Sequence, residues 1–463
     1  MTDGFTDGSD TTPSLSRSGF DAFLTSGTIL ALGLLSTLAV ARGLGPSGKG
    51  RFDLLVATGA MLSLFLGLHL PTGITYVVAR GNARLETLER DMALFAVAEG
   101  AVAALILWAA WLAFGSEWGS ASNGWASPLV LGALVVAFVV LSAVASLWRG
   151  VLIGRQQIIR ANRRDLVVRS IQVGLVVIVV VVGASLGREI EPGIVYAVTV
   201  VAALAAALIF VRSVSDMPPA KVPLPEGEGA FGEAIRFALP TYLGNVVQMA
   251  NYRLDLFFIA FFVGAAQVGI YSIAVVLSQL VWLVPRAVAL VLLPSTAAAQ
   301  DDVGKNSDRA AMGARVALWG GAGACLALAV VASWAIPLVF GTDFSDSSAL
   351  LLWLLPGVWL LSPAVVMASF VAGVGKPSLN LMVWAAGFVV TVGLDLVLIP
   401  GRGATGAAIA STAAYSFSAI LMAVVFVRLS TAGFADVLIP RKSDATAVIR
   451  AARSAIARRD VVA

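Results

Sequence analysis

Long apolar runs dominate this chain and restrict its fold more than any other feature. A helix needs about 20 apolar residues to cross the roughly 30 Å hydrocarbon layer of a membrane. Only 13% of the residues are charged, whereas soluble domains carry about 25%. We therefore predict an all-α polytopic membrane protein with about 12 transmembrane helices. The predicted spans are 20–41, 53–79, 92–114, 127–150, 166–186, 193–211, 235–263, 267–294, 312–333, 349–373, 379–399 and 404–427.

A segment rich in Pro and acidic residues divides the spans into two sets of six. Because six spans precede it, both sets start on the same side, which predicts a parallel repeat and hence two parallel six-helix lobes. Gly45, Gly50, Phe52 and Gly154 recur 219 residues later as Gly264, Gly269, Tyr271 and Gly373, which favours a duplication. The predicted divisions are a disordered cytoplasmic tail (1–18), an N-lobe (19–212), a cytoplasmic linker (213–230), a C-lobe (231–428) and a basic cytoplasmic tail (429–463) that can form an amphipathic helix over 443–460.

Basic residues are distributed unevenly between the two sides of the predicted membrane. If the N-terminus is cytoplasmic, 24 of the 31 Lys and Arg residues fall in cytoplasmic segments and five in outer loops, among them Lys49. The remaining two, Arg253 and Arg286, lie inside spans. Since Lys and Arg accumulate on the cytoplasmic side of membrane proteins, we predict that both termini are cytoplasmic.

Several kinds of site are disfavoured by composition and by incomplete motifs. The chain has one Cys and one His, which excludes an internal disulfide and a Cys/His metal cluster. Gly43 to Lys49 resembles a phosphate-binding loop, but Gly50 follows where Ser or Thr must hold magnesium. The basic residues report membrane orientation rather than a nucleic-acid surface. We therefore predict neither a nucleotide nor a nucleic-acid partner.

The seventh predicted span carries five polar residues that hydrocarbon tolerates poorly without partners. They are Asn245, Gln248, Asn251, Arg253 and Asp255. One interpretation places them in a substrate cavity, where Arg253 binds phosphate and the amides bind sugar hydroxyls. The other is structural, with the amides joining helices and Arg253 paired with Asp395 of the eleventh span. The sequence leaves both open.

Three more polar residues lie in other spans. Arg286, in the eighth span, has no acid at its depth in its own lobe and is a candidate for the cavity. Glu99, at a similar depth in the other lobe, is a candidate partner for Arg286 in a gate, or else a structural or buried neutral acid. His69 lies beside the helix-breaking Pro71, either packed or as a proton-coupling site.

Four pieces of the chain occur in a characteristic order along the twelve spans: ARGLGPSGKGRFDLLVA, NYRLDLFFIAFFVGAAQVGIYSIA, VAGVGKPSLN and GATGAAIAST. In order and spacing they resemble the polysaccharide biosynthesis flippases. These form the lipid-linked oligosaccharide branch of the multidrug/oligosaccharidyl-lipid/polysaccharide exporter superfamily. Asp255 stands where such proteins often carry an acid.

The resemblance implies a V-shaped pair of lobes around a central cavity. It also implies transport of undecaprenyl-pyrophosphate-linked glycans from the inner to the outer leaflet of the bacterial cytoplasmic membrane. The expected partners are the lipid-linked glycan, membrane lipids, and the glycosyltransferases and polymerase of the same pathway. No cofactor is expected, and coupling to an ion gradient is left open.

Three alternative functions are weaker. A drug or metabolite antiporter of the same superfamily shares the resemblance. A major-facilitator carrier is disfavoured because the second cytoplasmic loop, ARGNARLETLERD, lacks that family's pattern. A glycan polymerase or ligase would carry a large outer loop with catalytic groups, whereas the predicted outer loops are short. We therefore expect a transporter and not an enzyme.

Overall fold

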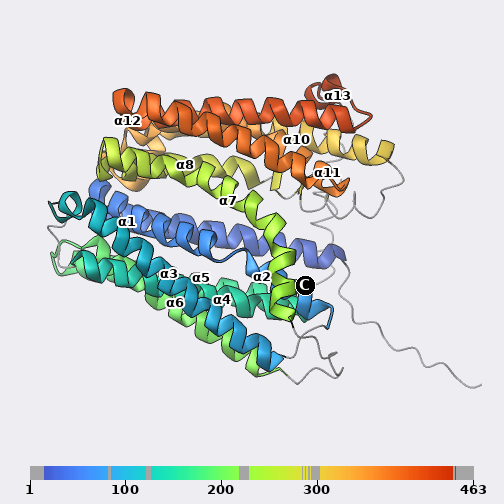
Figure 1. The fold of residues 1–463 in the computed structure, drawn as a ribbon. Coiled ribbons are helices and arrows are strands. Elements are labelled where there is room, and N and C mark those ends of the chain that lie inside the picture. Colours follow the sequence, from blue (N-terminus) through green and yellow to red (C-terminus); the bar gives the residue numbers. More distant parts are fainter. Residues whose placement is uncertain are drawn as a thin grey trace, which may run out of the picture.

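The structure is a computed structural model and describes residues 15–81, 85–120, 127–217, 229–283, 285–286, 288–289, 292, 303–441 and 444. In these residues it contains helices and no strands (Figure 1). The helices are α1 (Leu15–Leu66), α2 (Leu70–Ala79), α3 (Leu85–Ser120), α4 (Pro128–Gly154), α5 (Ile158–Ser185), α6 (Pro192–Ser215), α7 (Ala230–Phe262), α8 (Ala265–Ser278), α10 (Val303–Phe340), α11 (Ser347–Gly373), α12 (Pro377–Leu429) and α13 (Phe434–Leu438), with 3-10 turns η1 (Gln279–Trp282) and η2 (Thr342–Phe344).

The helices account for the predicted membrane spans. Nine helical segments of the described residues are long and apolar enough to cross a membrane. Two of these, in α1 and α12, consist of two arms joined at Gly45 and Gly403, whose φ angles are 64° and 57°. Glycine adopts such angles without the steric cost that a Cβ adds. With both arms counted and α7 added, the predicted all-α polytopic architecture of about 12 spans is confirmed.

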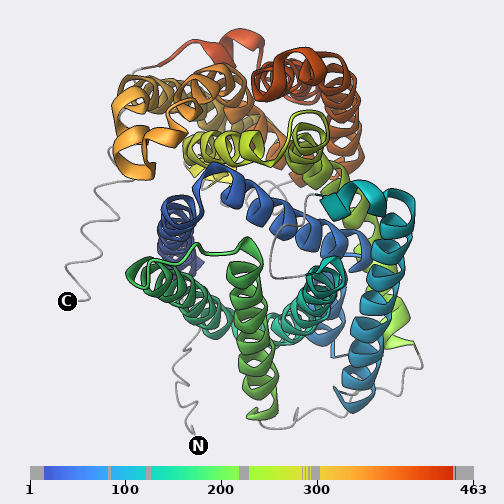
Figure 2. The same ribbon diagram turned by 90° about the vertical axis from the view of Figure 1, so that its left-hand side faces the viewer.

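The helices form two groups that lie side by side (Figures 1 and 2). The N-lobe contains α1 to α6, and the C-lobe contains α8 to α12. The C-lobe has one large apolar core, whereas the N-lobe has two smaller ones. Helix α7 joins the groups, because its first turns pack in an N-lobe core through Ala234 and its last turns in the C-lobe core through Leu256 and Ile259. The two lobes are thus connected by a continuous helix.

The shift of 219 residues seen in the sequence recurs in the backbone. Helices α4 and α11 each have 27 residues, and their bounds differ by that shift. Both end in the same hydrogen-bond pattern, in which Gln156 N donates to Ile153 O over 2.9 Å and Gly375 N donates to Ala372 O over 3.0 Å. Gln156 and Gly375 also share a positive φ, of 61° and 79°. The lobes are therefore alike in local structure as well as in sequence.

The repeated glycines form the contact between the lobes at one end of the molecule. A Cβ on Gly50 would lie 1.7 Å from Ala265 O, and a Cβ on Gly269 would lie 2.1 Å from Pro46 O. Pro46 and Ala265 are themselves 219 residues apart, so the contact is reciprocal, as at a two-fold axis. We call this end, which also carries Gly45 and Gly403, the glycine end. The opposite end, where α6 stops and α7 starts, is the linker end.

Two predicted tails and the linker lie largely outside the described residues. Of the tail predicted over 1–18, only the last four residues are described, and they already belong to α1. The linker is described only at its edges, up to Met217 and from Gly229. In the basic tail, α13 and Asp444 are described, so the amphipathic helix predicted over 443–460 stays a prediction.

Candidate functional site

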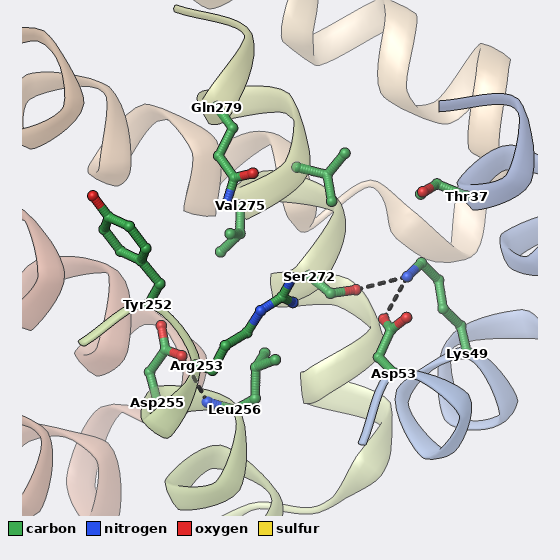
Figure 3. Close-up of a pocket in the computed structure, with 11 residues that line it drawn as sticks. Thr37, Lys49, Asp53, Tyr252, Arg253, Asp255, Leu256, Ser272, Val275 and Gln279 are labelled. Carbon is green, nitrogen blue, oxygen red and sulfur yellow. Dashed lines mark hydrogen bonds and ion pairs between the residues drawn. The ribbon is translucent and has the colours of Figure 1, made fainter. Parts of the chain in front are cut away.

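A cavity of about 70 Å³ lies between the lobes, at the junction of α1, α7 and α8 (Figure 3). Helix α1 brings Lys49 and Asp53 to it, α7 brings Arg253 and Asp255, and α8 brings Ser272. The other lining residues are Thr37, Tyr252, Leu256, Val275, Val276 and Gln279. Two of the five predicted residues of the seventh span therefore face an inter-lobe space together with two charged residues of the N-lobe.

Lys49 lies in this cavity, although it was predicted to lie in an outer loop. The lysine belongs to the second arm of α1 and is 2% exposed. Its Nζ pairs with the Asp53 carboxylate and donates to Ser272 Oγ of the C-lobe over 2.8 Å. Asp53 and Ser272 are themselves 219 residues apart. The spacing of Lys49 and Asp53, four residues apart in one helix, is the sequence signal that could have indicated their ion pair.

Arg253 extends its guanidinium group into the cavity, toward Ser272 (Figure 3). Among the ion pairs found in the described residues, none involves Arg253. The predicted structural alternative, a pair with Asp395, is therefore not formed here: both Asp395 carboxylate oxygens are buried without a hydrogen-bond partner in that part of the chain. Arg253 is a half-buried cation with its donors available in a cavity.

A second cluster of polar groups lies inside the C-lobe, behind this cavity. Asp255 accepts hydrogen bonds from Tyr271 OH, at 2.6 Å, and from Leu256 N, at 2.8 Å. Asp395, which is fully buried, interacts electrostatically with Asp255. Two carboxylates in one low-dielectric interior repel each other when both are ionised, so the arrangement favours a proton or a cation.

Two of the three remaining amides, those of Asn251 and Asn245, connect α7 to other elements. Asn251 accepts a hydrogen bond from Thr391 of α12 over 2.6 Å. Asn245 contacts the ring nitrogens of His69 at 3.2 Å, and Gln248 is hydrogen-bonded to Tyr252. Asn251 is buried in this conformation and does not line the inter-lobe cavity. Its contact with Thr391 fits the interpretation in which amides join helices.

The candidates for a gate are separate in this conformation. Arg286 is exposed and lies over the ring of Trp282, 5.5 Å from its centroid. Glu99 is 4% exposed, and neither carboxylate oxygen has a hydrogen-bond partner among the described residues. The predicted pair between Glu99 and Arg286 is not formed here and stays a prediction for another conformation.

No group of three or more His, Cys, Asp or Glu residues that could hold a metal ion occurs in the described residues. The inter-lobe cavity offers the guanidinium nitrogens of Arg253 to an anion, and the C-lobe cluster offers oxygens to a proton or a monovalent cation. The two sites share α7, which carries both Arg253 and Asp255.

Comparison with known proteins identifies a family and several proteins of similar fold. Residues 61–349 match a family described as polysaccharide biosynthesis protein. The inward closed conformation of the lipid II flippase MurJ is 12% identical with a TM-score of 0.69, and covers 89% of this chain and 90% of its own. No curated protein matches the sequence.

Two transporter structures of the MOP superfamily have the same fold. An inward-facing multidrug resistance MATE family transporter is 18% identical with a TM-score of 0.68, over 87% of this chain and 95% of its own. An outward-facing conformation of such a transporter is 16% identical with a TM-score of 0.59, over 89% and 95%. At these identities the similarity concerns the fold.

Proposed function

The chain belongs to the polysaccharide biosynthesis protein family, and from this we propose that it flips an undecaprenyl-pyrophosphate-linked oligosaccharide across the bacterial cytoplasmic membrane. The broader class, a membrane flippase or transporter, is supported by the solved structures of similar fold, which are a lipid II flippase and MATE family transporters. MATE family transporters of this fold occur in inward- and outward-facing conformations. The fold therefore works by alternating access.

The observation that carries the substrate proposal is Arg253, a cation in the inter-lobe cavity that forms no ion pair among the described residues. A lipid pyrophosphate cannot cross hydrocarbon unscreened, because burying an unpaired anion costs many kcal/mol. Arginine binds phosphate through two parallel N–H groups and keeps its charge. Arg286, farther along the same lobe, would be a second contact on the path.

Orientation and partners follow from the charge distribution and the family. We assign both termini and the linker end to the cytoplasm, and the glycine end to the outer side, because Lys and Arg gather at the former. In this conformation the glycine contacts would then close the outer side. A lipid-linked glycan would enter from the cytoplasmic leaflet, and glycosyltransferases of the pathway would supply it.

The C-lobe carboxylates would couple transport to a gradient of protons or of a monovalent cation. Asp255 and Asp395 would exchange a proton or a monovalent cation during the cycle, since two adjacent buried carboxylates are stable only when partly neutralised. No resident cofactor is required by this scheme. Coupling through α7 is direct, because Asp255 is two residues from Arg253.

The experiment that tests the proposal measures flipping in proteoliposomes and in cells. A deletion strain without a paralogue should accumulate glycan-loaded undecaprenyl-pyrophosphate in the inner leaflet. Arg253→Ala should lower flipping roughly 10- to 100-fold, which corresponds to about 1.5–3 kcal/mol for a hydrogen bond to a charged group. Arg253→Lys should retain part of the activity, and the exposed Arg188→Ala is the matched control. Normal glycan display in the deletion strain would refute the proposed function.

A drug or metabolite antiporter is the second candidate, favoured by the acidic C-lobe cluster and by the MATE-like fold. Arg253, which has no ion pair among the described residues, would repel cationic drugs in the cavity, which is why we rank this function lower. Efflux of cationic compounds that survives Arg253→Ala, with no effect on lipid-linked glycans, would select it.

A further inference from the structure

Glu99 is a buried carboxylate that the proposed transport path does not use. It lies in α3 of the N-lobe, away from the cavity lining and from the C-lobe cluster. No charged group of α1, α2, α4 or α7 in the described residues interacts with it, and both of its oxygens lack donors there. An ionised carboxylate so placed would cost several kcal/mol. Glu99 therefore needs a neutralising partner.

The carboxylate lies against a break in a membrane helix. Helix α1 ends at Leu66 and α2 starts at Leu70, and between them Leu68 and His69 have φ angles of 49° and 52°. Left-handed angles at residues other than glycine are strained and concentrate at functional sites. A Cβ on Gly67 would lie 3.7 Å from Glu99 Oε1. The acid and the break are thus in direct proximity.

The backbone at this break donates no hydrogen bond to the acid. Gly67 N donates to Ser63 O over 3.1 Å, Leu70 N to Gly67 O over 2.9 Å, and Thr72 N to His69 O over 3.1 Å. The C-terminus of α1 also adds partial negative charge beside the carboxylate. These surroundings favour the neutral acid. A metal ion would require several further oxygen ligands, whereas a proton requires none.

Helix α7 also contacts this break, through two polar side chains. Tyr242 OH donates to Phe65 O over 2.6 Å, and Asn245 contacts His69 at 3.2 Å. The close approach of Gly73 to Ala234 O continues this contact along α2. Since α7 also carries Arg253 and Asp255, it connects the break to both candidate binding sites.

We propose that Glu99 is a proton-binding site of the N-lobe that operates the helix break at 67–69 and, through it, α7. Glu99 holds the proton while the glycine end is closed and releases it when the break moves away and water reaches the carboxylate. His69 is the titratable group on the facing element, and its contact with Asn245 is the link to α7. This inference rests on the alternating access of the proposed function and adds a coupling site to it.

The first test detects the proton itself, in the full-length protein in lipid nanodiscs. The infrared C=O band of protonated carboxylic acids should lose one component in Glu99→Gln and keep it in the exposed control Glu86→Gln. An unchanged band would overturn the proposal, because Glu99 would then be ionised. A component that disappears only on adding sodium would also overturn it, in favour of a metal ion.

The second test detects the hinge. Spin labels at Arg51 and Phe261, both exposed near the glycine end, report its opening in a Cys325→Ala background. In the native protein the open fraction should rise with pH. Glu99→Gln should abolish this dependence, while Glu86→Gln should retain it. A pH dependence that persists in Glu99→Gln would contradict the coupling.

Neither test uses a glycan. If the protein shows the Glu99 band and the pH-driven opening but flips no lipid-linked glycan, the proposed function fails alone. If it flips the glycan with no sign of a protonated Glu99, only this inference fails.

Discussion

Lys49 links the two lobes through a single side chain. Its buried ammonium group bonds to Asp53 of its own lobe and to Ser272 at the equivalent position of the other. Long charged side chains are stable inside a protein only with such partners. Opening the glycine end must separate Lys49 from Ser272, so this bond stabilises the closed conformation and not the open one.

Replacing Lys49 should therefore favour opening. In Lys49→Met, external labelling of a cysteine at the cavity residue Val276 should accelerate roughly tenfold, because a hydrogen bond to a charged group contributes about 1.5–3 kcal/mol. The measurement uses an impermeant thiol reagent in the Cys325→Ala background. Arg51→Met, at an exposed neighbouring position, should label as the native protein does. Equal rates in the two variants would show that Lys49 does not hold the lobes together.

At the scale of elements, α7 and α10 each make a connection that their apolar sequences do not suggest. Helix α7 spans from an N-lobe core to the C-lobe core. Helix α10 holds the chain that follows α12, because Arg315 Nε and Nη2 donate to Asp444 over 2.8 and 2.9 Å. Trp319 Nε1 adds a hydrogen bond to Leu438 O over 3.0 Å. The C-terminal segment is thereby docked onto the linker end.

This docking should depend on pH. The hydrogen bonds from Arg315 hold the pKa of Asp444 below its usual range, which is about 3.9 in unfolded chains. Because the pKa of Asp444 is lower in the docked state, ionised Asp444 stabilises docking at pH values above the unfolded pKa. This stabilisation is lost as the pH falls through the lower, docked-state pKa. Hydrogen exchange in α13 should thus increase below about pH 4.

Asp444→Asn should increase that exchange already at neutral pH, roughly 5- to 30-fold for a loss of about 1–2 kcal/mol. The exposed Asp343→Asn, at the glycine end, serves as control and should leave α13 unchanged. Exchange in α13 that is the same in Asp444→Asn and the native protein would mean that the Arg315 contact does not dock this segment.

At the scale of the whole molecule, the reciprocal glycine contact holds the two lobes together at the glycine end. Backbone meets backbone at Gly50 and Gly269, where a Cβ would overlap with a carbonyl of the other lobe. Small residues let membrane helices approach this closely. Because the two positions are related by the duplication, they meet as matched halves while this end is closed.

A side chain at Gly50 should hold the lobes apart. Gly50→Val should shift the protein toward the outward-open conformation and lower flipping at least tenfold, with membrane-inserted protein still present. Distances between spin labels across the glycine end measure the shift. The matched control is Gly393→Ala, since a Cβ at Gly393 meets nothing within 4 Å. A closed glycine end in Gly50→Val would mean that the contact is dispensable.

Much of the fold was predictable, because the membrane imposes local rules. Each span needs about 20 apolar residues with internally bonded backbone, so the twelve runs indicated the helices without tertiary information. The duplication was visible at Gly45 and Gly50 because turns and close approaches require glycine at both copies. Of the candidate site, the seventh span was identified, since polar residues there need partners wherever they lie.

What the sequence by itself determined is thus the set of helices, their repeat and the helix that carries the site. Only the tertiary structure decided which side chains meet: Lys49 with Ser272, Glu99 with the break at Gly67, and Arg253 with a cavity rather than Asp395. The physical reason is that these contacts join residues far apart in the chain. Between helices in a membrane, where apolar surface provides little preference for one face over another, close packing of small residues and a few polar bonds select the partners.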